Sequence, residues 1–126
     1  MVNDLISDSL IRIKNGYMAR HKSVELIGSK AVRALAELLV KSGYLEKVDK
    51  NGYNLMVTLH YENKKPVLNE VKIVSTPSVR IYVKKNNIPV VLGGLGTCVV
   101  STPKGLMTGN QAKKSQLGGE LICEIW

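Results

Sequence analysis

The chain has 126 residues, of which 44% are hydrophobic, so it is long and apolar enough for one ordinary domain or two small ones, and disorder is excluded as its main state. Its 18 lysines and arginines outnumber 10 acidic residues, which gives a formal net charge of +8. This charge predicts an anionic partner, with nucleic acid as the leading candidate. The alternative is a basic protein whose charge serves only its solubility.

No segment of the sequence resembles a secretion signal or a membrane span. The start, Met1-Val2-Asn3-Asp4, is acidic and leads into an amphipathic pattern, whereas a signal peptide begins with basic residues. The longest nearly apolar run, 88–100, is too short to cross a bilayer and contains Pro89. The two cysteines, Cys98 and Cys123, stand far apart in strand-like segments. They predict two buried thiols in a cytoplasmic protein rather than a disulfide or a metal site.

Two amphipathic helices are predicted in the first half of the chain. Apolar residues at helical spacing indicate one helix over about 3–20 and a second over 30–42, with a short strand over 23–27 between them. Ser29 is the expected N-cap of the second helix. The residues expected to face the core are Ile6, Leu10, Ile13 and Tyr17 in the first helix and Val32, Leu35, Ala36 and Leu39 in the second.

A β-hairpin should follow these helices. Asn51-Gly52 separates the strands 44–50 and 53–61, and this dipeptide favours a type I′ turn. In the second strand an alternating set should form the buried face of a sheet: Tyr53, Leu55, Val57, Leu59 and Tyr61. A further strand over 67–74 would complete an αβαβββ unit. We place the domain boundary between residues 73 and 74, before the turn-forming Ser75-Thr76-Pro77-Ser78.

The second half of the chain is basic and predicted to be mostly β. Strands are expected over 79–84, 96–102 and 120–126, and Thr108 should cap a short helix that reaches about Gln116. The overall fold class is therefore α+β, with an N-terminal αβαβββ domain, 1–73, and a β-rich C-terminal domain, 74–126. Between Val71 and Gly119 no acidic residue occurs, yet seven basic residues do: Lys72, Arg80, Lys84, Lys85, Lys104, Lys113 and Lys114. A basic segment without carboxylates suits a partner rich in phosphate.

No pattern in the sequence predicts an enzyme. His21 and His60 lack a serine or cysteine partner at a spacing typical of nucleophilic catalysis, and no metal-ligand cluster occurs. The segment Leu92-Gly93-Gly94-Leu95-Gly96 resembles a phosphate loop, but it lacks the Gly-Lys-Ser/Thr ending and a following helix. We interpret it as a structural bend, with a nucleotide-dependent enzyme as the alternative. We therefore expect no catalytic residue, metal ligand, cofactor or small-molecule substrate.

Structured RNA is the nucleic acid that fits best. The chain has no Phe and its tyrosines are scattered, which disfavours single-strand binding by stacking, and neither long helix resembles a DNA-recognition helix. In the segment 101–105, the hydroxyls of Ser101 and Thr102 can donate to and accept from base edges and ribose oxygens. Gly105 allows backbone amides to approach RNA, and Lys104 supplies charge. An ordinary hairpin turn explains the same residues equally well.

Four motifs resemble the family of bacterial small-subunit ribosomal protein eight, and they occur in the family's order over the whole chain. They are Arg12-Ile13-Lys14-Asn15, Leu92-Gly93-Gly94-Leu95-Gly96, the stretch from Val100 to Thr108, and Gly118-Gly119-Glu120. The resemblance implies two α/β domains and a structural, non-enzymatic role in the cytoplasmic ribosome. It implies direct binding to the central domain of small-subunit ribosomal RNA, help in assembling its platform and, in some bacteria, translational repression of the protein's own operon. Implied neighbours are small-subunit proteins five and twelve or seventeen, and the free protein should be a monomer.

The resemblance and the residue chemistry together predict two RNA-binding sets. In the C-terminal set, Ser101 and Thr102 should discriminate shape and bases, while Arg80, Lys84 and Lys104 anchor phosphates. The remaining members of this set are Tyr82, Gly105, Gly118, Gly119 and Glu120. The N-terminal set comprises Arg12, Lys14, Asn15, Arg20, Lys22 and Lys30.

Three positions depart from the family pattern, because Thr76-Pro77-Ser78, Val90 and Gly109-Asn110 replace residues that are common there. These departures affect single backbone contacts rather than the family assignment. The alternative to a ribosomal role is a free regulator of translation that binds structured RNA and never enters a ribosome.

Overall fold

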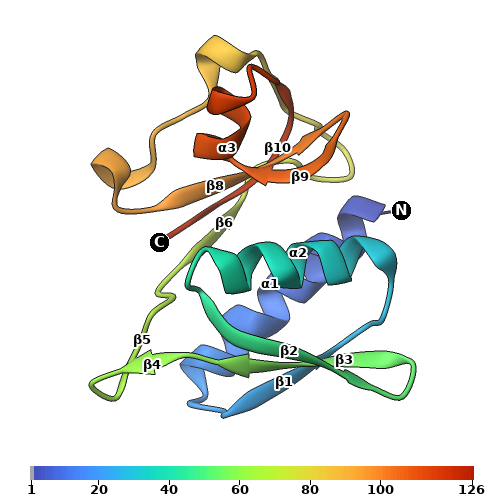
Figure 1. Cartoon of the computed structure of the whole chain (residues 1–126), viewed down its shortest axis with the longest axis vertical. Coiled ribbons are helices and arrows are strands. Elements are labelled where there is room, and N and C mark those ends of the chain that lie inside the picture. The colour runs from blue at the N-terminus through green and yellow to red at the C-terminus, as the bar shows by residue number, and fades with distance from the viewer. Residues whose placement is uncertain (1) are drawn as a thin grey trace. The chain divides into compact units, whose positions relative to one another are not determined.

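The computed structural model describes residues 2–126, with side chains from residue 4 onward, and it is divided into two compact units (Figure 1). The first unit ends at Asn69 and the second comprises Glu70–Trp126. Both combine helices with antiparallel sheet, so the predicted α+β class is confirmed. No helix among the described residues is long and apolar enough to span a membrane.

In the first unit, two helices pack on one face of a three-stranded antiparallel sheet with the strand order β1-β3-β2 (Figure 1). A small two-stranded hairpin, β4–β5, follows the sheet. The elements are α1 (Val2–Met18), β1 (Ser23–Leu26), α2 (Lys30–Lys41), β2 (Leu45–Asn51), β3 (Asn54–Leu59), β4 (Tyr61–Glu62) and β5 (Lys65–Pro66).

The apolar stripes predicted for the two helices form the core of this unit. Every residue of both stripes is buried, with at most 2% of its surface exposed. Ser29 is the N-cap of α2, since its side-chain oxygen accepts a hydrogen bond of 3.1 Å from the Val32 amide. Both predictions are confirmed. The same core holds the Tyr17 hydroxyl, which accepts a hydrogen bond from the His60 amide at 3.0 Å, and burial raises the pKa of Tyr17.

The predicted hairpin exists, but its turn lies one residue later than expected. Asn51 pairs with Asn54 in the sheet, so the turn residues are Gly52 and Tyr53 rather than Asn51 and Gly52. Gly52 has a φ of +65°, which glycine adopts at little cost. The Asn51 amide instead donates to a carboxylate oxygen of Glu25 at 2.9 Å. As a result, Tyr53 is fully exposed and not part of the buried face, whereas Leu55, Val57 and Leu59 are buried as predicted.

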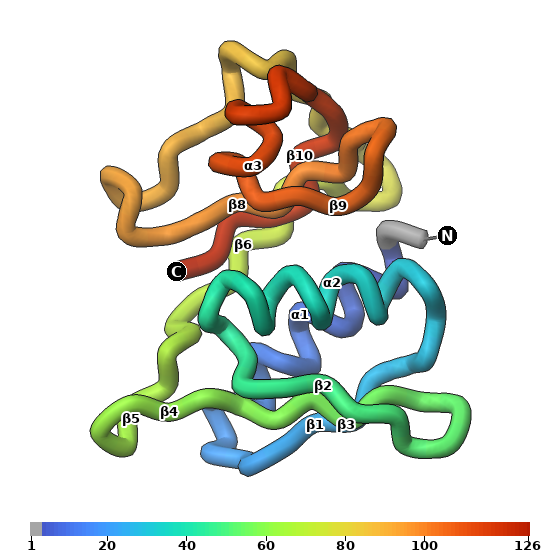
Figure 2. The backbone as a smooth tube through the Cα atoms, viewed as in Figure 1, coloured from blue at the N-terminus to red at the C-terminus, as the bar shows by residue number. Residues whose placement is uncertain are grey.

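The second unit is a five-stranded antiparallel sheet with the order β6-β10-β8-β9, in which β7 also pairs with β10. Figure 2 labels β6, β8, β9 and β10 along the backbone. Helix α3 packs on one face, where Ala112 joins Val100 and Leu121 in a buried apolar cluster. The elements are β6 (Val71–Ile73), β7 (Tyr82–Val83), the short 3₁₀ helices η1 (Lys85–Asn87) and η2 (Val91–Gly94), β8 (Thr97–Thr102), β9 (Gly105–Thr108), α3 (Gly109–Lys114) and β10 (Gly119–Ile125).

Both cysteines of this unit are buried free thiols, as the sequence predicts. Burial raises the pKa of Cys98, and it raises the pKa of Cys123 far above the usual range of a thiol. Thr108 caps α3 through a capping box, because its hydroxyl accepts from the Gln111 amide and the Gln111 side chain accepts from the Thr108 amide. This cap is also confirmed.

The strand predicted over 67–74 is wrong in its extent and in its sheet. Only Val71–Ile73 form a strand, β6, and they pair with Cys123–Ile125 of β10 in the second unit. The change of unit therefore comes between Asn69 and Glu70, before the predicted boundary at 73/74. Similarly, the strand expected over 79–84 is reduced to β7, and β9 was not expected.

Candidate nucleic-acid interface

The turn between β8 and β9 is a two-residue hairpin loop made of Pro103 and Lys104. Thr102 pairs with Gly105, which has a φ of +111° that only glycine adopts readily. The Thr102 hydroxyl donates to the Gly105 carbonyl at 2.8 Å and accepts from the Lys104 amide at 3.2 Å. Lys104 itself is exposed. The turn is thus held in one shape, with its cation toward solvent.

Thr102 does not present its hydroxyl outward beside Ser101, as the sequence analysis expected. Its side chain is 7% exposed, and its hydroxyl is engaged by the turn's own backbone. Neighbouring residues of a strand point to opposite faces, so Thr102 lies on the same face as Val100, under α3. Ser101 lies on the other face and is half-buried. The prediction of a pair of outward hydroxyls is therefore wrong, and Ser101 alone remains.

Three strands bring residues distant in sequence onto the face that carries Ser101. Glu120 of β10 pairs with Ser101 on one side and with Tyr82 of β7 on the other. Directly paired residues have side chains on the same face. Lys84 follows β7 with an extended backbone, so alternation puts its side chain on the side of Tyr82. Tyr82 is 71% exposed and Lys84 is exposed. We call Ser101, Tyr82 and Lys84, with Lys104 of the adjoining turn, the β7–β8 face.

Arg80 is not the free phosphate anchor that the sequence predicts. Its guanidinium Nη1 lies 3.7 Å from Oε2 of Glu120, and the two side chains are only 17% and 11% exposed. Glu120 is the first acidic residue after the acid-free segment, and the pairing of β7 with β10 places it next to Arg80. The Arg80 charge is therefore largely matched inside the protein, which leaves the nearby lysines as the exposed cations.

Gly118 and Gly119 allow close approach of backbones. A Cβ atom on Gly119 would lie 2.0 Å from the Ser101 carbonyl oxygen, and one on Gly118 would lie 2.4 Å from that of Val83. Any side chain at either position would push β10 away from β8 or from β7. These glycines thus position Ser101, Tyr82 and Lys84 relative to one another.

Part of the predicted N-terminal set gathers at the C-terminal half of α1. Arg12 and Asn15 line a shallow hollow together with His21 and with residues of β1. Lys22, the residue before β1, is exposed, whereas Lys14 is half-buried. His21 was not predicted as part of this set, although its position in a basic loop was evident from the sequence.

Two other members of that set are placed differently. Arg20 has a positive φ of 61°, and its guanidinium donates to the Lys64 carbonyl of the β4–β5 hairpin, so this side chain also orders a loop. Lys30 is the first residue of α2. It follows the C-terminal end of β1, whereas Lys22 precedes the N-terminal end, and Gly28 between β1 and α2 packs against the backbone of Tyr53. The structure therefore does not bring Lys30 together with Lys22 and Arg12.

A second group of basic and amide side chains was missed by the sequence analysis. Lys85 and Asn86 of η1 line an open hollow together with Lys113 of α3 and Gln116, which follows α3. We call it the η1–α3 hollow. Both lysines belong to the acid-free segment, but their meeting depends on the packing of two elements about 30 residues apart, which local sequence patterns do not reveal.

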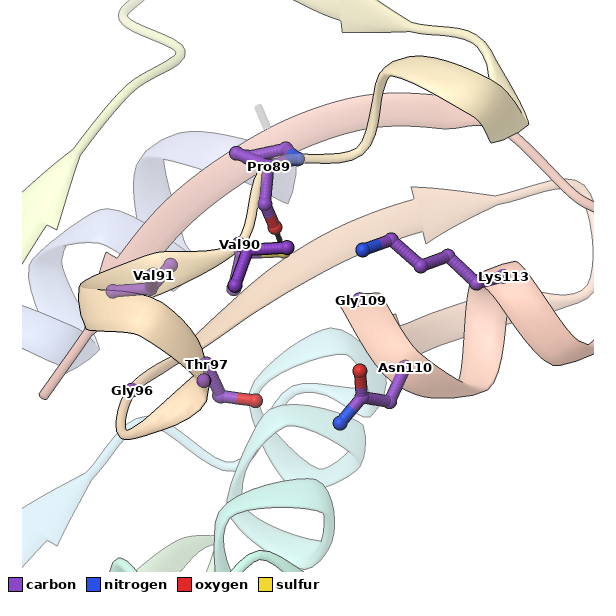
Figure 3. A pocket seen from close by; sticks show the side chains of 10 residues that line it. Pro89, Val90, Val91, Gly96, Thr97, Gly109, Asn110 and Lys113 are labelled. Atoms are coloured by element: carbon purple, nitrogen blue, oxygen red, sulfur yellow. Dashed lines mark hydrogen bonds between the residues drawn. The ribbon is translucent and has the colours of Figure 1, made fainter.

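The pocket beside the glycine-rich segment before β8 is too small to enclose a nucleotide. The pocket beside it has a volume of about 30 Å³, enough for water but not for a larger ligand. It is lined mainly by small and apolar residues, and Lys113 is the charged side chain at its rim (Figure 3). Among residues 4–126, no group of three metal-ligating side chains is arranged to hold a metal ion.

Comparisons with known proteins agree on one family. Residues 4–126 match the family described as Ribosomal protein S8. The chain is 45% identical to "Small ribosomal subunit protein uS8" of Nitratidesulfovibrio vulgaris strain DP4 over 126 residues, which is the full length of both proteins. It is 44% identical to the protein of the same name from Caldanaerobacter subterraneus, with 100% of this chain and 99% of the relative covered. The corresponding protein of Mycoplasmopsis synoviae is 43% identical, with 99% and 98% covered.

These matches cover the chain almost completely, so they apply to both structural units. They confirm the resemblance that the four motifs indicate, together with the non-enzymatic role and the cytoplasmic, ribosomal location predicted with it. The chain therefore belongs to the ribosomal protein S8 family and is a structural protein of the small ribosomal subunit.

Proposed function

We propose that the chain binds the central domain of small-subunit ribosomal RNA directly, through the β7–β8 face, and so helps to assemble the platform of the subunit. The observation that carries the proposal is the position of Ser101 on the same face as Tyr82 and Lys84, beside the exposed Lys104. A hydroxyl, an aromatic ring and two cations are a combination suited to folded RNA, where ribose hydroxyls, bases and phosphates lie close together.

The roles of these four side chains differ. Lys84 and Lys104 supply charge to phosphates, which gives affinity for any RNA. Ser101 can donate to and accept from a base edge or a ribose hydroxyl, which gives discrimination. Tyr82, with 71% of its surface exposed, offers a ring for stacking and a hydroxyl for hydrogen bonding. Arg80 and Glu120 support the face from within through their ion pair.

The N-terminal set would form a second, smaller contact. Arg12, Asn15 and His21 share one hollow on α1, and Lys22 is exposed nearby. We assign this hollow to the RNA backbone, since a guanidinium, an amide and an imidazole line it, while Glu25, which also lines it, accepts a hydrogen bond from Asn51. Lys30 lies outside it.

The direct test is the affinity of the purified protein for a central-domain RNA fragment. Ser101→Ala should weaken binding of the cognate fragment by about 1–3 kcal/mol, because the hydroxyl reads the RNA, and should leave non-specific RNA unaffected. Ser42→Ala, which removes another half-buried serine hydroxyl in the first unit, is the matched control and should bind as the unaltered protein does. Equal affinities of the Ser101→Ala variant and the control would remove this role from Ser101.

Three further proposals follow from membership in the family and need separate tests. Footprinting on complete small-subunit RNA should protect the central domain, and cross-linking in assembled subunits should capture proteins five and twelve or seventeen. Sedimentation of the free protein should show a monomer. Translational repression of its own operon would appear as protein-dependent inhibition of that messenger. A free regulator, in contrast, would bind messenger RNA but fail to co-sediment with small subunits.

A further inference from the structure

The η1–α3 hollow has the chemistry of a binding surface although no predicted site residue lines it. Its walls are the side chains of Lys85, Asn86, Lys113 and Gln116, all of which are exposed. Two ammonium groups and two amides converge there, and no carboxylate lines the hollow. An exposed pair of like charges repels unless an anion lies between them, so the hollow favours a negatively charged ligand.

Backbone contacts hold the two walls of the hollow in place. A Cβ on Gly118 would lie 2.4 Å from the Val83 carbonyl oxygen and 3.1 Å from the backbone nitrogen of Lys85. The segment after α3 therefore runs directly against the start of η1. The Leu117 amide donates to the Ala112 carbonyl at 2.9 Å, which fixes the end of α3. The backbone positions of the two lysines are therefore fixed before a ligand binds, which lowers the entropic cost of binding.

Further lysines adjoin the two lysines of the hollow in the sequence. Lys84 precedes Lys85, and Lys114 follows Lys113, and both additional lysines are exposed. The nearest acid along β10, Glu120, is engaged by Arg80 at 3.7 Å. Lys113 extends along the rim of the small neighbouring pocket, whose other lining residues are uncharged (Figure 3). Among the described residues, no carboxylate lines either the hollow or this neighbouring pocket.

The side-chain types indicate which part of a nucleic acid would enter. Ammonium groups are point charges that bind phosphate without reading sequence, and the amides of Asn86 and Gln116 can bond ribose hydroxyls. No aromatic ring lines the hollow, so a base would find nothing to stack on. A sugar–phosphate backbone is therefore the matching ligand.

We propose that the η1–α3 hollow binds the sugar–phosphate backbone of the same RNA that contacts the β7–β8 face, and positions it without reading its sequence. This inference rests on the proposed RNA-binding function. It is favoured over an acidic protein segment as the ligand because the amides of Asn86 and Gln116 suit ribose hydroxyls beside the two ammonium groups, and no apolar side chain lines the hollow to hold a peptide. Because α3 covers the face of the sheet opposite Ser101, the backbone in the hollow belongs to a second segment of that RNA.

The test is the salt dependence of binding to a central-domain RNA fragment. The double variant Lys85→Gln, Lys113→Gln should lower the slope of log affinity against log salt by about 0.9 for each lost phosphate contact, and affinity at 0.1 M salt by about 8-fold for each. The loss should be equal for cognate and unrelated RNA. Lys85→Arg, Lys113→Arg should keep the slope, because the charges remain.

Lys72→Gln is the matched control, since it removes an exposed lysine from β6, which pairs with the opposite end of β10. It should retain affinity and slope. All three variants change exposed side chains, and thermal unfolding checks that they remain folded. An unchanged slope in the Gln double variant would overturn the proposal, and so would normal RNA binding combined with lost attachment to a neighbouring protein in reconstituted subunits. If the unaltered protein binds no subunit RNA, the proposed function itself fails, which is a distinct result.

Discussion

Strand β8 follows a glycine-rich loop and is followed by a two-residue turn that ends at Gly105, and the two connections have opposite chemistry. The loop before it, 91–96, exposes apolar side chains: Leu92 is 54% and Leu95 is 87% exposed, and no charged residue occurs from Ile88 to Val100. The turn after it exposes Lys104 and is braced by the Thr102 hydroxyl. The first loop resembles a phosphate loop in its glycines, yet only the turn after β8 has an exposed cation that could attract an anion.

The difference shows why glycine content alone does not predict anion binding. A phosphate loop needs backbone amides that are free and convergent, with a cation nearby. In the first loop the Leu95 and Gly96 amides donate to carbonyls of the loop itself, both at 3.1 Å. A strand rather than a helix follows it. The phosphate-loop interpretation therefore fails on geometry, in agreement with a family that contains structural proteins.

The sharpest contrast concerns the glycines themselves, and the largest expected effect is on stability. Gly119→Ala should destabilise the protein by about 3 kcal/mol or more, because the new methyl group meets the Ser101 carbonyl at 2.0 Å and the strands must separate. Gly93→Ala, in the loop at the other end, meets no atom within 4 Å and pays only for its positive φ of 61°, about 1 kcal/mol.

Urea unfolding followed by Trp126 fluorescence measures both values, since this only tryptophan of the chain packs against the core of the second unit. Equal losses in the two variants would show that β10 can move away from β8 at little cost. The proposed role of Gly119 in holding Ser101 and Tyr82 together would then be wrong.

The next contrast concerns threonines at the two ends of β8. Thr102→Val removes the hydroxyl that bonds the Gly105 carbonyl and the Lys104 amide, so it should cost about 1–2 kcal/mol and loosen the turn. Thr97→Val, the same change at the start of the strand in a half-buried position, should alter the free energy of unfolding by about 0.5 kcal/mol or less. Urea titration distinguishes the two, and similar values would mean that the turn does not depend on the Thr102 hydroxyl.

Local sequence patterns predicted the helices and caps that are stabilised by residues close together in the sequence. Ser29 and the stripe around Leu35 determine α2 within a dozen residues, and Thr108 with Gln111 determines the cap of α3. The strand Val71–Ile73 shows the limit, because its sequence suits any sheet and only its pairing with β10, about 50 residues later, assigns it to the second unit. Such pairings depend on the register of distant strands, which periodicity does not encode.

The candidate site follows the same division. Charge and motif indicated Lys84 and the turn at Lys104; both lysines are exposed, and their contact with RNA stays a prediction. The alternation of β8, which was already available from the sequence, should have separated Ser101 from Thr102. In contrast, the ion pair of Arg80 with Glu120 and the meeting of Lys85 with Lys113 depend on tertiary packing, so no reading of the chain alone could have found them.

A charge comparison between the two connections tests binding rather than stability. Lys104→Gln should reduce RNA affinity by about 8-fold at 0.1 M salt, which is about 1.2 kcal/mol, and lower the salt slope by about 0.9. Leu95→Gln, an exposed residue at the other end of β8, should leave both unchanged. Filter binding at several salt concentrations measures these values. A comparable loss in the Leu95 variant would mean that RNA contacts both ends of the strand.

The smallest expected effect is a gain in stability at Leu92. This leucine has a φ of 47° and ψ of 47°, a left-handed conformation that is costly for a residue with a side chain, and its exposure of 54% leaves little burial to lose. Leu92→Gly should therefore stabilise the protein by about 0.5–1 kcal/mol, after the greater flexibility of the unfolded glycine chain is subtracted. RNA affinity should not change, because the loop carries no charge. A measurable loss of stability in urea would indicate that Leu92 contributes packing that offsets its strained backbone, and a loss of RNA binding would place RNA at the apolar end of β8 as well.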